Sequence, residues 1–599
     1  MKDTTTGIAP QNEARTGASR NLTKVWAGFV GDPIHVIAVI VFALNVLLVS
    51  ASFFPNLSEI NAWDEAGYVN SGRVLLDGQW PSFSNSPLVA MLYALTSLAY
   101  LESPFWLVHS TTLGRIFLFA LVWFGSYAVA RRLGKTARPL FMIGLLFVGA
   151  LMVSLLSFPS DPLYVGFAAL SLASAMAYIS GGRNKHLGLA SLFMGLAALS
   201  RNDGLVLGIL LILATPFLVR PPASRWRAMA IAAGPFFALV GGYILFFGLI
   251  TGDFELGTLE RTYDNFEAGH QVITGGVGQV NPVIEAKLAA REVFGTPEEN
   301  NHSVFRAIAR NPRVYLQRLR AIVPQLPQQM LSAYGVRLAA PLFLFAARGI
   351  VELLRQRHFR LLGLFALWFV PLLAGFLITL FRIGHLRFPF YVVFALAATG
   401  MVASVRNIRS KREQAFLAAA LTAMVIYGLV DAKPAIVYAA VVTFAALALG
   451  LLVINYWTSL THKLVVPGML LLGAALLLHG DFPGPKTRIL GQFADEQGVK
   501  FLAENFDPGT PVAAGSPGPV YSAGMRYMGL TSLDVPRTDT AGEFLTWMKG
   551  QGIEAIYVDA SLSSDNPLFW DQISSLVGSD IERVFAADAG NIQVLRLRD

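Results

Sequence analysis

The sequence predicts an all-α polytopic membrane protein of about thirteen transmembrane helices, with interfacial helices and a small C-terminal α/β domain outside the membrane. Three observations predict this class. Hydrophobic residues make up 54% and charged residues only 14% of the 599 residues, and the mean hydropathy is +0.54. Apolar runs of roughly 14 to 23 residues recur, near the length that crosses about 30 Å of hydrocarbon as a helix. Polar sequence gathers in two long loops and the C-terminal tail.

Residues 1–32 are predicted to form a disordered cytoplasmic tail. They are rich in Thr, Asn and Ala and carry four cations, Lys2, Arg15, Arg20 and Lys24. The first apolar run, Ile34 to Phe54, is longer than the core of a usual signal peptide and lacks a convincing cleavage site. We therefore expect it to be a retained anchor.

Basic residues set the predicted topology, because Lys and Arg in short loops mark the cytoplasmic side. Alternate connections carry such cations, namely Arg131, Arg132, Lys135 and Arg138; Arg183 and Lys185; Arg220, Arg225 and Arg227; Arg348, Arg355, Arg357 and Arg360; and Arg406, Arg409, Lys411 and Arg412. The alternation holds if Ser86 to Leu101 is an interfacial helix and if Leu187 to Val219 is two short spans broken at Arg201-Asn202-Asp203-Gly204. Residues 33–479 then form the transmembrane domain, with outer loops at about 55–108 and 251–332.

Each outer loop is predicted to contain helices. In the first loop we expect an acidic helix from Ala62 to Leu76, a turn at Asp77-Gly78 and an apolar helix from Pro87. In the second loop, basic and apolar residues recur at helical spacing from Val304 to Arg320. Such a helix can lie among lipid headgroups or present a solvated basic face.

The tail, residues 480–599, is predicted to be an extracytoplasmic α/β domain. Its expected strands are 511–515, 555–559 and 592–597, and its expected helices are 541–551 and 566–576. The run Gly515-Ser516-Pro517-Gly518-Pro519 resembles a phosphate loop only superficially, since its prolines lack N–H donors. The chain contains no cysteine, which excludes disulfides and thiol redox chemistry.

The net charge of +8 is attributed to the topology and to contact with anionic membrane lipids. We therefore expect no nucleic-acid partner.

Acidic residues at the outer membrane edge are the candidate catalytic groups. Asp64 and Glu65 follow the first span, and a carboxylate there can take a proton from an acceptor as a general base. The alternative is that they cap or solvate an interfacial helix. Asp161 precedes Pro162 on the same side and is either a helix N-cap or a partner of Asp64 that polarises the acceptor. Asp64 and Asp161 are also possible ligands of a divalent metal, although such an ion prefers more oxygen ligands; no cofactor is certain.

Cations on the same side are candidates for holding a phosphate, because the planar guanidinium pairs with phosphate oxygens. They are Arg201 at the broken span, Arg115 early in the second span, and His385 and Arg387 in a cationic cluster. The alternative is that these side chains extend from helix ends to the lipid headgroups without a ligand. Arg201 and Arg387 depart from the usual cytoplasmic placement of cations, which favours a function for them.

The motif Asp64-Glu65-Ala66-Gly67-Tyr68, followed by Leu75-Leu76-Asp77-Gly78-Gln79-Trp80, resembles the first outer loop of the GT-C membrane glycosyltransferases. Within that superfamily the sequence is most similar to the protein O-mannosyltransferase and lipid A aminoarabinose transferase group. Further matches are Pro87-Leu88, Arg115-Ile116, Asp161, Arg201 to Gly204 and Arg387-Phe388-Pro389. The segment Ser84-Asn85-Ser86 departs from the group, which usually has a basic residue there, so the sugar stays open.

The resemblance implies an inverting transferase on the outer face of the inner (plasma) membrane. Its donor would be a polyprenyl-phosphate-linked sugar and its acceptor a glycan, lipid or protein. In that reading Asp64 is the base, assisted by Asp161, and the other residues bind substrate: Glu65 and Tyr68 orient the acceptor, Tyr263 and Asp264 contact it, and Arg201, Arg387, Arg115 and His385 hold the donor phosphate.

Two other functions fit the same composition. A transporter or flippase of lipid-linked glycans also needs many spans, but it needs polar residues deep within them, whereas these spans are almost wholly apolar. A membrane scaffold without activity fits if the acidic motif only solvates its helix.

Overall fold

The computed structural model describes residues 38–46, 64–79, 86–100, 106–145, 158–218, 224–252, 258–274, 282–334, 336–380, 383–430, 492–530, 540–559, 567–587 and 591–598, with a few single positions between them. Helices form nearly all of the described residues before residue 431, and a five-stranded sheet lies near the C-terminus. The chain is a multi-pass membrane protein.

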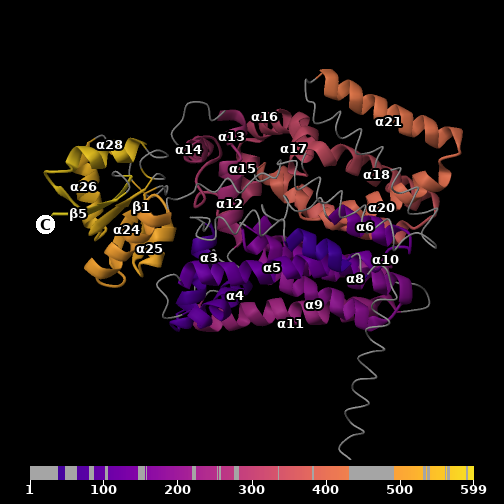
Figure 1. Cartoon of the computed structure of the whole chain (residues 1–599), viewed down its shortest axis with the longest axis horizontal. Coiled ribbons are helices and arrows are strands. Elements are labelled where there is room, and N and C mark those ends of the chain that lie inside the picture. Colours follow the sequence, from indigo (N-terminus) through magenta and orange to yellow (C-terminus); the bar gives the residue numbers. More distant parts are fainter. Residues whose placement is uncertain are drawn as a thin grey trace, which may run out of the picture.

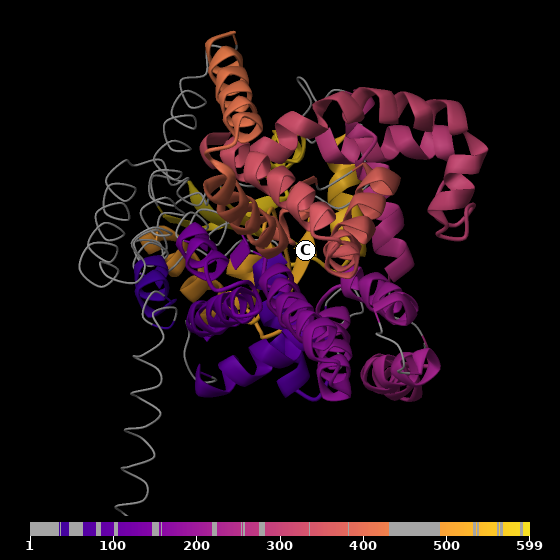
Figure 2. The same cartoon turned by 90° about the vertical axis from the view of Figure 1, so that its right-hand side faces the viewer.

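Five described helices are long and apolar enough to cross a membrane: α5 (Trp106–Ala130, from Ser110), α8 (Ser160–Gly181), α11 (Arg225–Thr251), α19 (Phe359–Thr379) and α20 (Phe390–Asn407). In Figure 1, α5, α8, α9 and α11 run side by side, and Figure 2 views the same bundle from its end. The expected number of about thirteen spans stays a prediction, because residues 431–491 lie outside the described part.

Close helix contacts in the bundle depend on glycine. In α18 (Val336–Arg355) and α20, a Cβ added to Gly349 would lie 2.0 Å from the carbonyl oxygen of Leu396. A Cβ on Gly400 would lie 1.9 Å from that of Phe345. The two backbones therefore touch, as small residues allow in membrane helix pairs.

The break predicted over Arg201 to Gly204 is confirmed at its first residue, and the other three residues belong to the next helix. Helix α9 (Asn184–Ser200) ends there, Arg201 is extended with φ −157°, and α10 (Asn202–Leu218) starts at the next residue. Gly204 permits the tight turn, since a Cβ there would lie 2.5 Å from the backbone of Ala197. A polar segment inside an apolar run thus forms an irregular point between two short helices.

The first outer loop has the predicted form. Helix α3 (Asp64–Leu76) ends in a turn at Gly78 with φ +78°, and α4 (Pro87–Ser97) leads into the 3₁₀ turn η2 (Leu98–Tyr100). Gly72 of α3 lies against the backbone of α4, where an added Cβ would be 2.5 Å from the amide of Ala94. The two outer helices are therefore held tightly together.

The second outer loop has a small apolar core of its own, built from Tyr263, Phe266, Ala290, Phe294, Val304 and Ala307. Its elements are α12 (Thr258–Ala268), α13 (Gln271–Thr274), α14 (Pro282–Phe294), α15 (Val304–Arg310), α16 (Pro312–Ile322), η4 (Val323–Gln325) and α17 (Leu326–Ala333). The prediction of a single helix from Val304 to Arg320 is wrong, because the structure has two helices there, α15 and α16. Asn311 ends α15 and caps α16, and Pro312 opens α16, because proline fits the first turn of a helix but not its interior.

The expectation that Arg348 lies in a cytoplasmic loop is also wrong. It lies within α18 and is buried, and its Nε is 2.9 Å from Oε1 of Glu413 in α21 (Lys411–Val430). Its Nη1 is 3.1 Å from Glu352. A cation paired with two carboxylates can be buried inside a helix bundle, so its position need not mark a loop.

The remaining short elements of the membrane part are α6 (Ala137–Gly144) and the 3₁₀ segment η5 (Ile383–Arg387). Helix α6 packs against α5 and α20. Segment η5 joins α19 to α20 and contains two of the predicted site residues, His385 and Arg387.

The C-terminal region is the expected α/β unit. Its sheet has the order β2-β1-β3-β5-β4, with β1 parallel to β2 and β3, and β5 antiparallel to β3 and β4. The strands are β1 (Pro511–Ala514), β2 (Arg526–Gly529), β3 (Ala555–Val558), β4 (Ile581–Ala587) and β5 (Ile592–Leu597), and the helices are α24 (Gln492–Asn505), α25 (Pro517–Ser522), α26 (Ala541–Gly550) and α28 (Pro567–Leu576). Strands β2 and β4 lie at the sheet edges and were not expected.

Apolar side chains cover both faces of this sheet. Helices α26 and α28 supply Phe544, Met548 and Ile573 to one face, and α24 supplies Leu502 to the other. Helix α25 contacts α3, and Tyr521 packs against the apolar core of the membrane part. Figure 1 shows the C-terminal sheet next to α3 and the second outer loop.

Candidate active site

An ion pair between two segments that are distant in the sequence forms the centre of the candidate site. Nη1 of Arg201, at the break between α9 and α10, lies 2.5 Å from Oδ1 of Asp161 in the first turn of α8. Its Nε lies 2.8 Å from Oδ2 of Asp203. Asp161 is only 4% exposed, and the N-cap position of α8 belongs to Pro159, so the N-cap interpretation of Asp161 is wrong.

The pairing also determines the charge of Arg201. Burial alone would lower the pKa of its guanidinium, but the negative charges of Asp161 and Asp203 raise it above its usual value. Arg201 is therefore a fixed cation held by two carboxylates.

An aromatic ring connects this pair to the cationic segment η5. The ring of His385 stacks on Phe388 at 4.7 Å, and the guanidinium of Arg201 lies over the same ring at 5.1 Å. Nδ1 of His385 is 3.4 Å from Nη2 of Arg201. Tyr164 of α8 also packs on Phe388, with ring centroids 5.6 Å apart. Packing on the ring of Phe388 therefore holds His385 beside Arg201, although the two residues are far apart in the sequence.

Arg387 differs from Arg201 in its hydrogen bonds. Its Nε is buried and has no hydrogen-bond partner among the described residues. Burial lowers the pKa of Arg387, and the charge of Asp161 opposes this change. The hydroxyl of Tyr334 donates to the carbonyl of Leu386 at 3.2 Å and so fixes the backbone beside it. Arg387 thus keeps an N–H donor that an anionic ligand can use.

Helix α3 reaches the same place through Tyr68. This side chain is 4% exposed, and its electrostatic effect on Arg201 puts it near the ion pair. Asp64 precedes Tyr68 by about one helical turn, so the two residues share a face of α3. The side chains of Asp64 and Glu65 lie outside the described part, and their predicted roles stay predictions.

Arg115 is buried in α5, at 7% exposure. The next residue toward the N-terminus, Gly114, lies against the ring of Tyr93 in α4, which fixes this part of α5 beside the first outer loop. Its predicted contact with donor phosphate stays a prediction.

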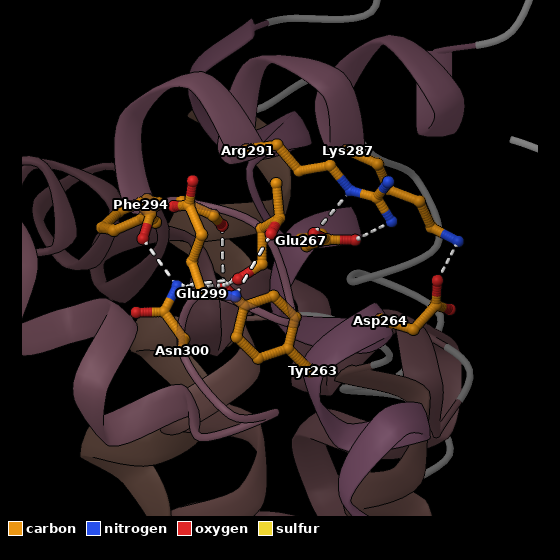
Figure 3. A network of polar contacts seen from close by, with 10 residues as sticks. Tyr263, Asp264, Glu267, Lys287, Arg291, Phe294, Glu299 and Asn300 are labelled. Atoms are coloured by element: carbon orange, nitrogen blue, oxygen red, sulfur yellow. Dashed lines mark hydrogen bonds and ion pairs between the residues drawn. The ribbon is translucent and has the colours of Figure 1, made fainter.

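Tyr263 and Asp264 lie in a network within the second outer loop (Figure 3). The hydroxyl of Tyr263 donates to the carbonyl of Gly295 and accepts from Nδ2 of Asn300, both at 2.8 Å, and the residue is fully buried. Asp264 pairs with Lys287. These contacts stabilise the loop, and the predicted contact of both residues with the acceptor stays a prediction.

The described residues contain no group of three or more His, Asp or Glu side chains that could hold a metal. Asp161 is already engaged with Arg201. A metal held by Asp64 and Asp161 stays a prediction, since the side chain of Asp64 is not among those described.

Sequence reasoning did not identify Asp203, Tyr164, Phe388 or Tyr334 as parts of this site. Asp203 had a usable signal, because it follows Arg201 closely in a polar break within an apolar run. The three aromatic residues are ordinary in composition for a membrane protein, and only their packing around Arg201 and Arg387 reveals them.

Comparison with known proteins identifies the fold. No protein-family model matches the sequence, and neither does any curated protein sequence. Among solved structures, the chain is similar to ArnT from Cupriavidus metallidurans bound to undecaprenyl phosphate, with a TM-score of 0.52, 15% identity, and coverage of 93% of this chain and 97% of that chain. It is less similar to the archaeal oligosaccharyltransferase AglB from Archaeoglobus fulgidus, in complex with an inhibitory peptide and a dolichol-phosphate, with a TM-score of 0.47, 11% identity, and coverage of 89% and 70%.

The likeness to ArnT extends over the membrane helices, the outer loops and the C-terminal α/β region, since it covers nearly all of both chains. This likeness shows that the chain shares the overall fold of ArnT, in agreement with the fold class predicted from the sequence.

Proposed function

We propose that the protein is an inverting glycosyltransferase that moves a sugar from a polyprenyl-phosphate carrier to an acceptor on the outer face of the cytoplasmic membrane. The observation that carries this proposal is the buried Nε of Arg387, which has no hydrogen-bond partner in the described part of the chain and lies beside the Asp161–Arg201 pair. A phosphate oxygen is the kind of acceptor that such a guanidinium takes. The fold shared with a protein bound to undecaprenyl phosphate supports the same class of donor.

The charges of the cluster support a phosphate ligand. Asp161 and Asp203 together carry one more charge than Arg201, and the charge of Asp161 also acts on Arg387, whose Nε has no hydrogen-bonded carboxylate among the described residues. An incoming phosphate would pair with the charge of Arg387, and it would gain negative charge when the sugar leaves. Arg387 and His385 would then stabilise the departing polyprenyl phosphate, and Arg115 is a further candidate contact.

In the proposed chemical step, one bond forms and one bond breaks at the anomeric carbon of the sugar. Asp64 takes the proton of an acceptor hydroxyl or amine while the acceptor atom forms a bond to the anomeric carbon of the sugar. The bond between that carbon and the phosphate oxygen breaks from the opposite face, and its electron pair leaves with the polyprenyl phosphate. Glu65 and Tyr68 orient the acceptor, and Asp161 keeps Arg201 in place and assists the base.

The proposed arrangement in the cell places residues 1–32 in the cytoplasm, residues 33–479 in the membrane and residues 480–599 outside it. Tyr263 and Asp264 are proposed acceptor contacts, through the outer loop that they stabilise. The acceptor is a glycan, lipid or protein.

The test is a transfer assay with purified protein, a polyprenyl-phosphate sugar and candidate acceptors. The expected products are free polyprenyl phosphate and a glycoside of inverted anomeric configuration. A parallel assay in the presence of a metal chelator tests whether transfer depends on a divalent metal. Retained configuration, or movement of intact donor across proteoliposomes without transfer, would contradict the proposal, and the second result would favour a flippase.

A further inference from the structure

Arg318 is a buried cation outside the candidate active site. It lies in α16 of the second outer loop and is fully buried. Its guanidinium lies over the rings of Phe266 and Phe294, at 4.5 and 5.6 Å. No carboxylate pairs with it in the described part, and its Nε and Nη1 have no hydrogen-bond partner there. Burial lowers its pKa to about 10. A cation buried at this cost calls for a reason.

The reason lies in the two carbonyls that Arg318 joins. Its Nη2 donates to the carbonyl of Phe266 in α12 at 2.8 Å and to that of Thr379, the last residue of α19, at 3.0 Å. The hydroxyl of Tyr315, one turn earlier in α16, donates to the carbonyl of Leu377 at 2.6 Å. Helix α16 thus binds carbonyls at the outer end of α19, which have no partner within that helix.

The chain is also crowded at this point. A Cβ on Gly269 would lie 1.9 Å from the carbonyl oxygen of Thr379 and 2.5 Å from Nη2 of Arg318. The backbone after α12 therefore touches the end of α19 directly. Leu380 closes the helix in the left-handed region, with φ +56°, which a non-glycine residue adopts only when its surroundings hold it there.

The fixed end of α19 leads directly into η5. This segment begins at Ile383 and carries both His385 and Arg387. His385 lies beside Arg201, and Arg387 lies within range of the charge of Asp161. Tyr334 at the end of the same outer loop holds the carbonyl of Leu386. The second outer loop therefore holds the backbone before η5, at Thr379, and within η5, at Leu386.

We propose that Arg318 is a positioning residue, which fixes the second outer loop to the outer end of α19 and thereby sets the position of His385 and Arg387. In its effect on transfer the inference rests on the proposed function. It predicts that disturbing Arg318 impairs use of the phosphate-bearing donor, although Arg318 itself does not contact it.

The first experiment compares Arg318→Met and Arg318→Lys with Arg313→Met, an exposed cation on the same helix. Arg318→Met is expected to raise the KM for the polyprenyl-phosphate sugar at least tenfold, with the acceptor KM changed less than twofold. Arg318→Lys should recover part of this loss, because an ammonium can donate to the same carbonyls. Arg313→Met should match wild type. Unchanged donor KM with a lower Tm would show a purely structural role and overturn the inference.

A second measurement needs no transferase activity. Amide hydrogen exchange of residues 380–388 is expected to be faster in Arg318→Lys than in wild type and Arg313→Met, with exchange in the C-terminal sheet unchanged. Unchanged exchange in 380–388 would refute the positioning role. If Arg318 variants fail to fold, Tyr315→Phe, which removes only the bond to Leu377, should raise exchange in the same segment to a smaller extent, and no rise would also refute it. If wild type shows no transfer with any donor, the proposed function fails while this exchange test still stands.

Discussion

Replacing Arg387 by methionine should weaken donor binding without weakening the fold. Nε of Arg387 has no hydrogen-bond partner among the described residues, so the change breaks no hydrogen bond of that atom to those residues in the free protein. It also removes a partly desolvated charge, and we expect the free energy of unfolding to change by less than about 1 kcal/mol. A phosphate bound to Arg387 would lose one charge-assisted hydrogen bond, worth about 1.5 to 3 kcal/mol. This corresponds to roughly ten- to hundredfold weaker binding.

The contrasting change is Asp161→Asn. It removes the negative charge that faces the buried guanidinium of Arg201, so the ion pair becomes at most a neutral hydrogen bond, although Asp203 still pairs with that group. Removing one charge of a buried ion pair lowers the free energy of unfolding by about 3 to 5 kcal/mol. Because Asp203 still pairs with Arg201, we expect Asp161→Asn to lower it by about 2 to 4 kcal/mol. Asp161→Asn should therefore lower stability, unlike Arg387→Met.

The assay is thermal unfolding in detergent, with and without undecaprenyl phosphate. Wild type and Arg406→Met, which changes an exposed arginine elsewhere in the bundle, should gain the same Tm increase from the lipid. Arg387→Met should have a near-wild-type Tm without lipid and a much smaller increase with it. A variant that loses stability but keeps donor affinity would refute the reasoning.

Three further predictions concern the fold. Burial lowers the pKa of His270 to about 4, against 6.5 for a free histidine, so the unfolded chain takes up a proton first as the pH falls from 6.5 to 4. Unfolding free energy should drop by about 2 kcal/mol between pH 8 and pH 5; His270→Gln should remove this loss, and exposed His358→Gln should not. Gly400→Ala should lower the free energy of unfolding by about 1 to 3 kcal/mol or more, because the added Cβ would lie 1.9 Å from a carbonyl oxygen of α18. Gly363→Ala, where a Cβ would meet no atom within 4 Å, should leave the Tm unchanged. The chain has no cysteine, so introduced cysteine pairs can be tested without background. Tyr521→Cys, combined with single cysteines along α3, should form a disulfide at the α25–α3 contact, whereas cysteines on α26 should form none with α3. Absence of any crosslink between α25 and α3 would contradict that contact.

Local patterns predicted much of the fold. The polar break at Arg201 interrupts an apolar run, and both the break and the two short helices are present. The acidic helix of the first outer loop and three strands of the tail follow equally local signals. The break before Pro312 was missed because basic and apolar residues keep helical spacing across it.

Long-range pairing could not be predicted from the sequence. Arg348 has the appearance of a loop cation, and its burial depends on Glu413, 65 residues away. Likewise, Asp161, Arg201 and His385 come from three separate segments that only tertiary packing brings together. The edge strands β2 and β4 are short or carry exposed charges, so they lack the alternation that marks a half-buried strand.

Sugar transfer by an Asp64→Asn variant tests the central claim most directly. The amide keeps the size of the side chain but cannot take the proton of the acceptor. We expect transfer from a polyprenyl-phosphate sugar to fall at least a thousandfold while donor binding stays within twofold of wild type. The matched control, Asp77→Asn at the exposed end of α3, should keep full activity. Full transfer by the Asp64→Asn variant would contradict the account.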